Sequence, residues 1–543
     1  MRGEVIDLAV RDGLRIIEGR RSIGRAVNGS VPGPLIRLRE GQNVRFNVVN
    51  QLREDTSIHW HGLLVPFQMD GVPGISFPGI KPDKTFTYDF PVRQAGTYWY
   101  HSHSGLQEQQ GHYGPLIIDP AGAEPVAYDR DYILLLSDYT VLDPHFIMSR
   151  LRTGEGYFNR QLTSWTDRYK LTGAERRMWA EMRMPATDIA DIGSPTYTFL
   201  ANGRGPKEGL EYLFRAGERI RLRIINGSAQ SFFNVRIPGL PMTIIAADGQ
   251  NVRPVEVDEF QIGTAEIYDV IVEPKSAEAY AIVGESMDRS GMALAMLASR
   301  PGARATVPAL RDPPLLTMGD MGMDHGSGGM DHAAMGHGAP AEKAAGAAMG
   351  AMSMDGMNMR DTSLLAPDVK VGPGIDMVSM SPADKMGDPG LGLRDVKHRV
   401  LNYRMLAALE PNKDTREPSR LLELHLTGNM ERYMWSFDGQ MYSAVSDVPI
   451  RFAWNERVRV KLINNTMMAH PIHLHGMFFE LVNGKSPAMQ PRKNVVIVQP
   501  GASATFDLTA NEAGDWAFHC HLMYHMHGGM MQTVTVMGPK GGA

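Results

Sequence analysis

The chain has 543 residues, enough for about three domains with cores of their own at roughly 150 residues per domain. Its net charge of −5 and its one cysteine exclude a basic nucleic-acid-binding surface and an intrachain disulfide framework. It has no apolar run of roughly 20 residues for a membrane span and no signal core at residues 1–10, so we expect a cytosolic protein or a mature exported form.

Three ten-residue stretches share a pattern of alternating apolar and polar residues that ends in asparagine. They are GQNVRFNVVN (41–50), GERIRLRIIN (217–226) and NERVRVKLIN (455–464). A period of two predicts a half-buried β-strand, and three copies predict three related β domains. Short strands between Gly and Pro turns, with almost no helical periodicity, predict an all-β fold of sandwiches.

Histidine pairs follow the first and third of these stretches at equal distances. His59 and His61 stand nine and eleven residues after the first stretch, and His473 and His475 stand at the same offsets after the third. The second stretch has apolar residues at those offsets. The first and third domains are therefore predicted to be sister scaffolds that share one metal cluster.

A second repeat adds another histidine pair to each of these two domains. AGTYWYHSH (95–103) matches AGDWAFHCH (513–521) in pattern. Residues i and i+2 of a strand point to one face and the residue between them points to the other. We therefore expect His519 and His521 to face one metal centre while Cys520 faces another. The four pairs give eight imidazoles, enough for about three coppers with positions open for O2.

Residues 301–390 differ in composition from the rest of the chain. They are rich in Gly, Ala and Met, and they lack apolar periodicity, which predicts a linker between the second and third domains. Because thioethers select Cu(I), we interpret the segment as a collector of cuprous ions, although low-complexity filler is the alternative. The candidate ligands lie in its repeated MDH motif: Met323, His325, Met330 and His332.

The C-terminal stretch HCHLMYHMHGGM (519–530) contains the only cysteine. One cysteine and two histidines with a distant methionine are the ligand set of a blue-copper electron-transfer site. The members of this set are Cys520, His470, His525 and Met530. Zinc needs no one-electron relay and does not explain the Cys–Met set, so copper is favoured over a zinc hydrolase site.

Together, the motifs HWHG, HSH, HPIHLHG and HCHLMYHMHGGM resemble those of the multicopper oxidases. The chain is most similar to the copper-resistance oxidases of bacteria, from VNGSVPGPLIRLREG to the C terminus, with a looser likeness in the middle. The resemblance implies three cupredoxin-like Greek-key β-sandwich domains and a Met-rich linker. The expected ranges are 1–125 for domain 1, 126–305 for domain 2, 306–392 for the linker and 393–543 for domain 3.

The resemblance also assigns about four coppers to each chain. The type 1 copper would be held by His470, Cys520 and His525, with Met530 as axial ligand. Type 2 would be held by His59 and His473. The binuclear type 3 pair would be held by His61, His101, His103, His475, His519 and His521. Cys520, His519 and His521 would carry electrons between the centres.

Four further residues are compared with the family at single positions. Asp70 resembles an acidic proton relay near type 2 copper, and the alternative is an ordinary turn residue before glycine. Met526 stands where several relatives have a glutamate, which leaves the proton path to the type 3 pair open. Met468 resembles the methionine that cuprous oxidases place beside type 1 copper, but Thr466 stands in place of its acidic partner.

The predicted function is an oxidase of the periplasm that couples Cu(I) oxidation to the reduction of O2 to water in copper resistance. The expected partners are O2, Cu(I) or small organic reductants and periplasmic copper-handling proteins, with no nucleic acid and no membrane span. One alternative is a laccase-like oxidase of phenols, which needs an open pocket over His470 or His525. A non-enzymatic copper-sequestering protein is disfavoured, because storage needs no trinuclear cluster.

Overall fold

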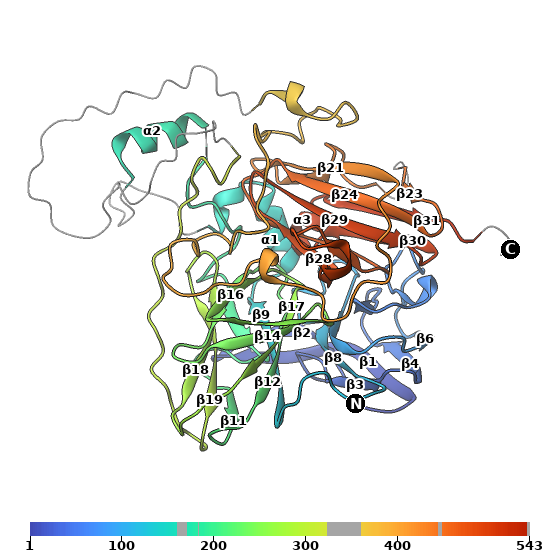
Figure 1. The fold of residues 1–543 in the computed structure, drawn as a ribbon, viewed down its shortest axis with the longest axis vertical. Coiled ribbons are helices and arrows are strands. Elements are labelled where there is room, and N and C mark those ends of the chain that lie inside the picture. Colours follow the sequence, from blue (N-terminus) through green and yellow to red (C-terminus); the bar gives the residue numbers. More distant parts are fainter. Residues whose placement is uncertain (160–170, 183, 323–359, 444–447, 540–543) are drawn as a thin grey trace, which may run out of the picture.

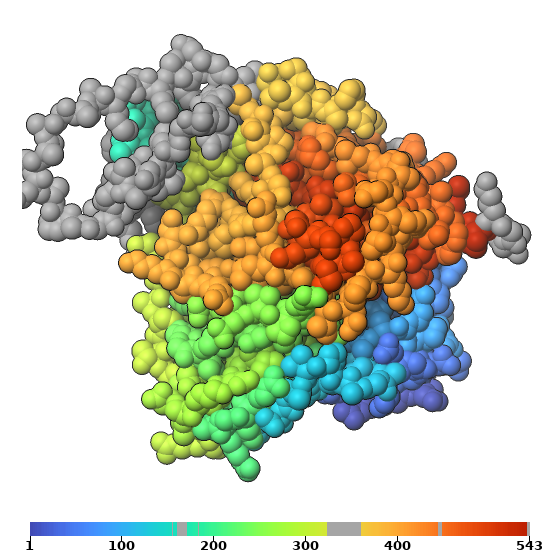
Figure 2. All heavy atoms as spheres, in the orientation of Figure 1, coloured from blue at the N-terminus to red at the C-terminus, as the bar shows by residue number. Residues whose placement is uncertain are grey.

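Two β-sheets in each of three consecutive stretches of chain form the framework of the protein (Figure 1). The structure is a computed structural model and describes residues 1–159, 171–182, 184–322, 360–443 and 448–539. Domain 1, in blue, and domain 2, in green, lie beneath domain 3, in orange and red, in the view of Figures 1 and 2. Hydrogen bonds join each domain to the other two, and the predicted all-β fold is confirmed.

Domain 1 has the strand orders β2-β1-β4-β6 and β3-β8-β7-β5. Its strands are β1 (Val5–Ile17), β2 (Arg20–Val27), β3 (Ile36–Arg39), β4 (Asn43–Asn50), β5 (His59–His61), β6 (Thr85–Pro91), β7 (Gly96–His101) and β8 (Tyr113–Asp119). In β4, Val44, Phe46 and Val48 are buried whereas Asn43 and Arg45 are exposed, as the period of two predicts.

Domain 2 has the strand orders β10-β9-β12-β17-β14-β15 and β11-β19-β18-β13-β16. Its strands are β9 (Arg130–Tyr139), β10 (Thr198–Ala201), β11 (Glu211–Leu213), β12 (Ile220–Asn226), β13 (Phe233–Arg236), β14 (Met242–Ala247), β15 (Gln250–Val257), β16 (Glu259–Ile262), β17 (Ile267–Val272), β18 (Tyr280–Ser286) and β19 (Met292–Ala298). Helices α1 (Pro144–Leu151) and α2 (Gly173–Met182) follow β9. None of the helices in the described ranges has the length and apolar character that a membrane crossing requires.

Domain 3 has the strand orders β22-β21-β24-β29-β26-β27, with β20 also paired to β29, and β23-β31-β30-β25-β28. Its strands are β20 (Ala383–Asp384), β21 (Arg420–Asn429), β22 (Met434–Phe437), β23 (Ile450–Phe452), β24 (Glu456–Asn464), β25 (His470–Leu474), β26 (Phe479–Leu481), β27 (Arg492–Lys493), β28 (Val495–Val498), β29 (Ala502–Ala510), β30 (Gly514–Cys520) and β31 (Met531–Val536). Helix α3 (Met523–His527) follows β30 directly.

The asparagine that ends each repeated strand closes the turn that follows it. Asn50, Asn226 and Asn464 are all 0% exposed. Each side-chain amide donates to two or more backbone carbonyls, and each side-chain oxygen accepts the N–H of the residue two positions later. An asparagine side chain offers both a donor and an acceptor, so this one residue satisfies a buried turn in all three domains. The sequence repeat is therefore a repeat of turn chemistry.

The described ends of the predicted linker pack against the neighbouring domains. The N–H of Leu316 donates to the carbonyl of Ala186 in domain 2, and Met321 is 0% exposed. On the other side, β20 adds to the sheet of domain 3. Residues 306–322 and 360–392 are thus built into the fold, while the domain boundaries at 125, 305 and 392 stay predictions.

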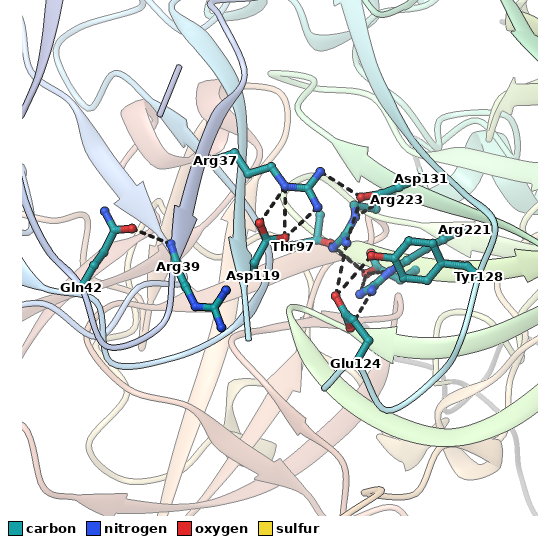
Figure 3. Close-up of polar contacts among 11 residues, drawn as sticks. Arg37, Arg39, Gln42, Thr97, Asp119, Glu124, Tyr128, Asp131, Arg221 and Arg223 are labelled. Carbon is teal, nitrogen blue, oxygen red and sulfur yellow. Dashed lines mark hydrogen bonds and ion pairs between the residues drawn. The ribbon is translucent and has the colours of Figure 1, made fainter. Parts of the chain in front are cut away.

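A partly buried network of ion pairs joins domains 1 and 2 (Figure 3). Arg37 of β3 pairs with Asp119 of its own domain and, at 3.1 Å, with Asp131 of domain 2. Arg223 of β12 pairs with Asp131 at 2.6 Å and donates to the hydroxyl of Thr97 in domain 1 at 2.8 Å. Arg223 is 1% exposed, so its own contacts are shielded from solvent, whereas the Arg37–Asp119 pair is partly exposed.

We expect Arg223→Met to lower the free energy of unfolding by about 1.5–3 kcal/mol, because Asp131 and Asp269 each lose one charged partner while Arg37 and Arg221 still pair with them. Chemical denaturation of the copper-free protein measures this change. Arg45→Met is the matched control, since Arg45 and Asp89 form an exposed pair with 55% and 45% of their side chains accessible. That control should cost no more than about 1 kcal/mol. Equal losses in both variants would contradict the expectation.

Candidate metal centre

Eight histidines, four from domain 1 and four from domain 3, meet at the boundary between these domains. They are His59, His61, His101, His103, His473, His475, His519 and His521. Strand pairing positions them in the same way in both domains: β5 and β7 set His59 opposite His101, and β25 and β30 set His473 opposite His519. The strand register at the histidines is thus equivalent in the two domains that were predicted to be sister scaffolds.

In this eight-histidine cluster, each ring from domain 1 lies next to a ring from domain 3. The centroid distances are 3.9 Å for His59–His475, 3.9 Å for His61–His473, 5.0 Å for His101–His521 and 5.1 Å for His103–His519. Seven of the rings are 2% exposed or less, and His103 is half-buried. Neither domain alone therefore forms the cluster.

Several ring nitrogens of the cluster have no protein partner. Backbone carbonyls accept from Nδ1 of His59 at 2.7 Å and of His473 at 2.8 Å. The opposite nitrogen, Nε2, has no hydrogen-bond partner among the described residues in His59, His61, His101, His103, His473 and His521. Buried polar atoms without partners are costly, so lone pairs that converge in this way fit a bound metal.

The imidazoles of the cluster are held in the form that binds metals. Burial, with repulsion between neighbouring rings, lowers the pKa of His61, His101, His103, His473, His475 and His521 well below the usual value, and burial lowers that of His519 to about 4. Neutral imidazole is the ligand form, so no proton has to be displaced at neutral pH. Soft or borderline metals such as copper suit such a nitrogen-rich donor set.

Asp70 spans the two halves of the cluster. Its carboxylate lies 2.9 Å from Nδ1 of His475 in domain 3 and 3.3 Å from Nδ1 of His59 in domain 1. Gly71 follows with a φ of +85°, and a Cβ there would lie 1.9 Å from the carbonyl oxygen of Ile58. Asp70 therefore both precedes a turn glycine and contacts the cluster histidines. Its role as a proton relay stays a prediction.

Glu108 is a second carboxylate at the cluster, and the sequence interpretation missed it. Its Oε2 lies 2.9 Å from Nδ1 of His101, and its Oε1 has no hydrogen-bond partner in the described structure. The side chain is 4% exposed, and burial together with the charge of Asp138 raises its pKa well above the usual value. Its position in the polar run QEQQ, seven residues after His101, is the only signal that the sequence offers.

A second candidate centre lies on the other face of β30. Sγ of Cys520 is 3.5 Å from Nδ1 of His470 and 3.9 Å from Nδ1 of His525, and the two nitrogens are 3.2 Å apart. Such separations fit one ion with bonds of about 2.0–2.3 Å. Met530 is 0% exposed, and its backbone bonds to those of Cys520 and His525. Burial raises the pKa of the Cys520 thiol, so a metal must stabilise the thiolate.

The outer nitrogens of both histidines in the cysteine centre are capped by protein. Nε2 of His470 lies 2.7 Å from the hydroxyl of Thr466, and Nε2 of His525 lies 2.9 Å from Oδ2 of Asp191 in domain 2. Trp435 stacks on the ring of His525 at 3.9 Å. Asp191 precedes His525 by 334 residues, so nothing in the sequence pointed to the pair.

The predicted Cu(I) ligands divide into one described residue and four outside the described ranges. Met468 is 2% exposed and lines a small cavity of about 10 Å³ between domains 2 and 3, together with Met287, Asp288 and Leu522. The remaining candidates lie outside the described residues: Met323, His325, Met330 and His332.

Comparisons with known proteins agree along the whole chain. Family models described as multicopper oxidase match residues 12–123, 161–301 and 415–539. The chain is 46% identical to copper resistance protein A of Escherichia coli, over 99% of this chain and 93% of that protein. It is 30% identical to multicopper oxidase MmcO of Mycobacterium tuberculosis, over 92% of this chain and 81% of that protein.

Two solved structures share the fold. Fet3p, a multicopper oxidase that functions in iron import, has a TM-score of 0.67 at 18% identity, covering 99% of this chain and 90% of that chain. The laccase from Botrytis aclada has a TM-score of 0.65 at 22% identity, covering 98% of this chain and 88% of that chain. At such identities the likeness shows the fold alone, and it confirms the predicted cupredoxin-like β-sandwich architecture.

Proposed function

The chain belongs to the multicopper oxidase family, and we propose that it oxidises Cu(I) with O2 as the electron acceptor, as part of copper resistance. It is an oxidoreductase whose cofactors are type 1, type 2 and type 3 copper. The observation that carries the proposal is the position of Cys520 between His519 and His521, which joins the cysteine centre to the eight-histidine cluster along one strand end.

The ligand assignment follows the two groups of side chains. For type 1 copper we propose His470, Cys520, His525 and Met530. For type 2 we propose His59 and His473, whose Nδ1 atoms both face backbone carbonyls. For the type 3 pair we propose His61, His101, His103, His475, His519 and His521. When bound, the copper supplies one-electron oxidation of the donor and four-electron reduction of O2.

The surrounding residues orient the ligands and supply protons. The Asp70 carboxylate accepts from Nδ1 of His475 and so fixes that ring across the domain boundary. The Oε2 of Glu108 lies 2.9 Å from Nδ1 of His101, whose own hydrogen bond goes to the carbonyl of Ser102, and the raised pKa of Glu108 favours the protonated carboxyl group that can donate a proton. Glu108 thus supplies, from domain 1, the acid that Met526 does not provide.

Glu108→Gln should slow O2 reduction on the order of 10²-fold while the blue type 1 absorption stays unchanged. The amide keeps the size and polarity of the carboxyl group, but it has no acidic proton to transfer. Stopped-flow reoxidation of the fully reduced enzyme measures the effect. A carboxyl group at the next position, introduced by Gln109→Glu, should not restore the reoxidation rate. Gln109 hydrogen-bonds Asp138 and Tyr197 rather than a cluster histidine. A wild-type reoxidation rate in Glu108→Gln would remove Glu108 from the mechanism.

The surroundings of the cysteine centre favour Cu(I) over a phenol as the electron donor. His470 and His525 are both 0% exposed, and Thr466 and Asp191 occupy the ring edges that a phenol would have to touch. The thioethers of Met468 and Met287 line the neighbouring cavity. Thioethers are soft ligands that select Cu(I), and a single ion needs far less room than an aromatic ring.

Steady-state O2 uptake with Cu(I) and with a phenol, at matched copper loading, tests this proposal. We expect a larger kcat/KM for Cu(I) in the wild-type enzyme. Met468→Leu, which keeps the volume and removes the sulfur, should lower kcat/KM for Cu(I) without lowering that for the phenol. Met477→Leu is the matched control, since Met477 is 3% exposed and does not line the cavity. A larger kcat/KM for the phenol would establish a laccase instead.

The setting of the reaction follows from the same proposal. Likeness to copper resistance protein A supports a place in the periplasm and contact with periplasmic copper-handling proteins. The methionine-rich residues 323–359 stay a predicted Cu(I) collector outside the described structure. Because Leu316 and Met321 are buried, that prediction is tested by Met→Leu exchanges within 323–359 rather than by a longer deletion.

A further inference from the structure

The turn between β14 and β15 of domain 2 lies where all three domains meet. At Gly249, which has a φ of +75°, a Cβ would lie 2.4 Å from the ring of Tyr98 in domain 1. Asp248 precedes it with a φ of +46° and is 1% exposed. Its side chain faces residues 493–495 of domain 3. The turn is therefore wedged between the two domains that form the eight-histidine cluster.

The Asp248 carboxylate holds the backbone of domain 3. Its Oδ2 accepts the N–H groups of Asn494 at 3.2 Å and Val495 at 3.1 Å, and it lies 2.9 Å from Nζ of Lys493. Its Oδ1 accepts the N–H of Ile267 in domain 2 at 3.0 Å. One carboxylate thus ties the start of β28 to β17 across the domain boundary.

Lys493 compensates the buried charge of this carboxylate. The side chain is 0% exposed, and Nζ also lies 3.1 Å from Oε1 of Glu266. The ammonium group is 5.0 Å from the ring centroid of Tyr268 and 5.7 Å from that of Tyr403. Buried networks whose members are paired in this way are rigid, which fixes residues 493–495 in space.

The same backbone segment orients a candidate type 2 ligand. The carbonyl of Asn494 lies 2.8 Å from Nδ1 of His473, and β25–β28 pairing sets His473 opposite Val495. A carbonyl only accepts, so Nδ1 carries the proton and the lone pair is on Nε2. Nε2 of His473 has no hydrogen-bond partner in the described part of the chain. The ring therefore directs its free lone pair into the cluster.

We propose that Asp248 of domain 2 is a positioning residue for type 2 copper, acting through the Asn494 carbonyl on His473. None of the described residues of domain 2 belongs to the cluster, yet Asp248 holds the backbone carbonyl that sets the tautomer and the orientation of one ligand. The proposal rests on His473 as a type 2 ligand, which belongs to the proposed function. Outer residues that orient histidine ligands are worth about 10–100-fold in metal affinity.

Two charge-balanced double variants of the full-length enzyme test this role. Asp248→Asn with Lys493→Met removes one carboxylate and the lysine together, because loss of a single member of a buried pair is far more destabilising. An asparagine also tolerates the positive φ at this position. Glu266→Gln with Lys493→Met is the matched control, since it removes the same lysine and a carboxylate of the same network but keeps both Asp248 oxygens. The asparagine variant keeps only one accepting oxygen for the N–H groups of Asn494, Val495 and Ile267. The readouts are copper per chain, the type 2 electron paramagnetic resonance signal and the blue absorption.

We expect both double variants to keep the blue absorption. The Asp248 variant should lose the type 2 signal and bind that copper about 10–100-fold more weakly in a chelator competition, and the control should keep it. A full type 2 signal in the Asp248 variant, or an equal loss in both variants, overturns the proposal. If the double variant does not fold, Asp248→Glu replaces it: a weakened type 2 signal supports the role and an unchanged one overturns it. His473→Ala tests the ligand assignment separately from the role of Asp248. A type 2 signal that survives in this variant refutes His473 as a type 2 ligand.

Discussion

Replacing Cys520 by serine should abolish both the blue colour and the oxidase activity while the eight-histidine cluster keeps its copper. The colour, at roughly 600 nm, arises from charge transfer between a thiolate and copper in a His2Cys site. Serine has nearly the same size but supplies no thiolate. Cys520 is also 0% exposed and stands directly between His519 and His521, so no other side chain replaces its link between the centres.

The control for this variant is structural. Ser102 occupies the position in domain 1 that corresponds to Cys520, so a serine between two cluster histidines is compatible with the fold. Cys520→Ser should therefore fold and bind type 2 and type 3 copper at wild-type levels, as copper analysis and electron paramagnetic resonance measure. A blue band that persists in Cys520→Ser would contradict the assignment of the cysteine centre.

His101→Ala and His519→Ala should fail in the same way although they alter different domains. Each removes one imidazole from the shared cluster, so O2 reduction should be lost while the blue absorption is retained. The two rings contact the opposite domain: His101 lies 5.0 Å from His521, and His519 lies 5.1 Å from His103, measured between centroids. O2 uptake, with the absorption spectrum recorded on the same sample, measures both properties.

His112→Ala is the control for the loss of a buried histidine outside the cluster. His112 is 0% exposed and lies in the same domain as His101, but its Nδ1 contacts the hydroxyl of Thr56 at 3.3 Å. It should reduce O2 after correction for the amount of folded protein. Near wild-type O2 reduction in His101→Ala or His519→Ala would exclude a cluster that both domains share.

The fold and the grouping of the histidines were predictable because each depends on short-range patterns. Alternation in residues 41–50, 217–226 and 455–464 predicted half-buried strands. The structure has strands there and confirms the all-β fold, but β12 in the second stretch is buried on both faces, with Arg221 and Arg223 paired to carboxylates. The period of two in a strand also separates Cys520 from His519. The structure places Cys520 against His470 and His519 against His475, on opposite faces of β30.

The residues that support the ligands were not predictable, because each reaches its partner through contacts between domains or across a loop. Asp191 and His525 are 334 residues apart, and Asp248 and Val495 are 247 apart. An aspartate before an ordinary turn carries no mark of such a contact. Glu108 was not predictable for a different reason: it lies in the polar run QEQQ, which has the composition of an ordinary loop.

The ratio of Cu(I) oxidised to O2 consumed tests the central claim most directly. An enzyme with a complete cluster between domains 1 and 3 passes electrons from the cysteine centre to O2 and releases water. Simultaneous recording of Cu(I) loss and O2 uptake should give about four Cu(I) per O2, with no hydrogen peroxide. A ratio of about two with accumulating peroxide, or Cu(I) binding without O2 uptake, would contradict the proposed oxidase.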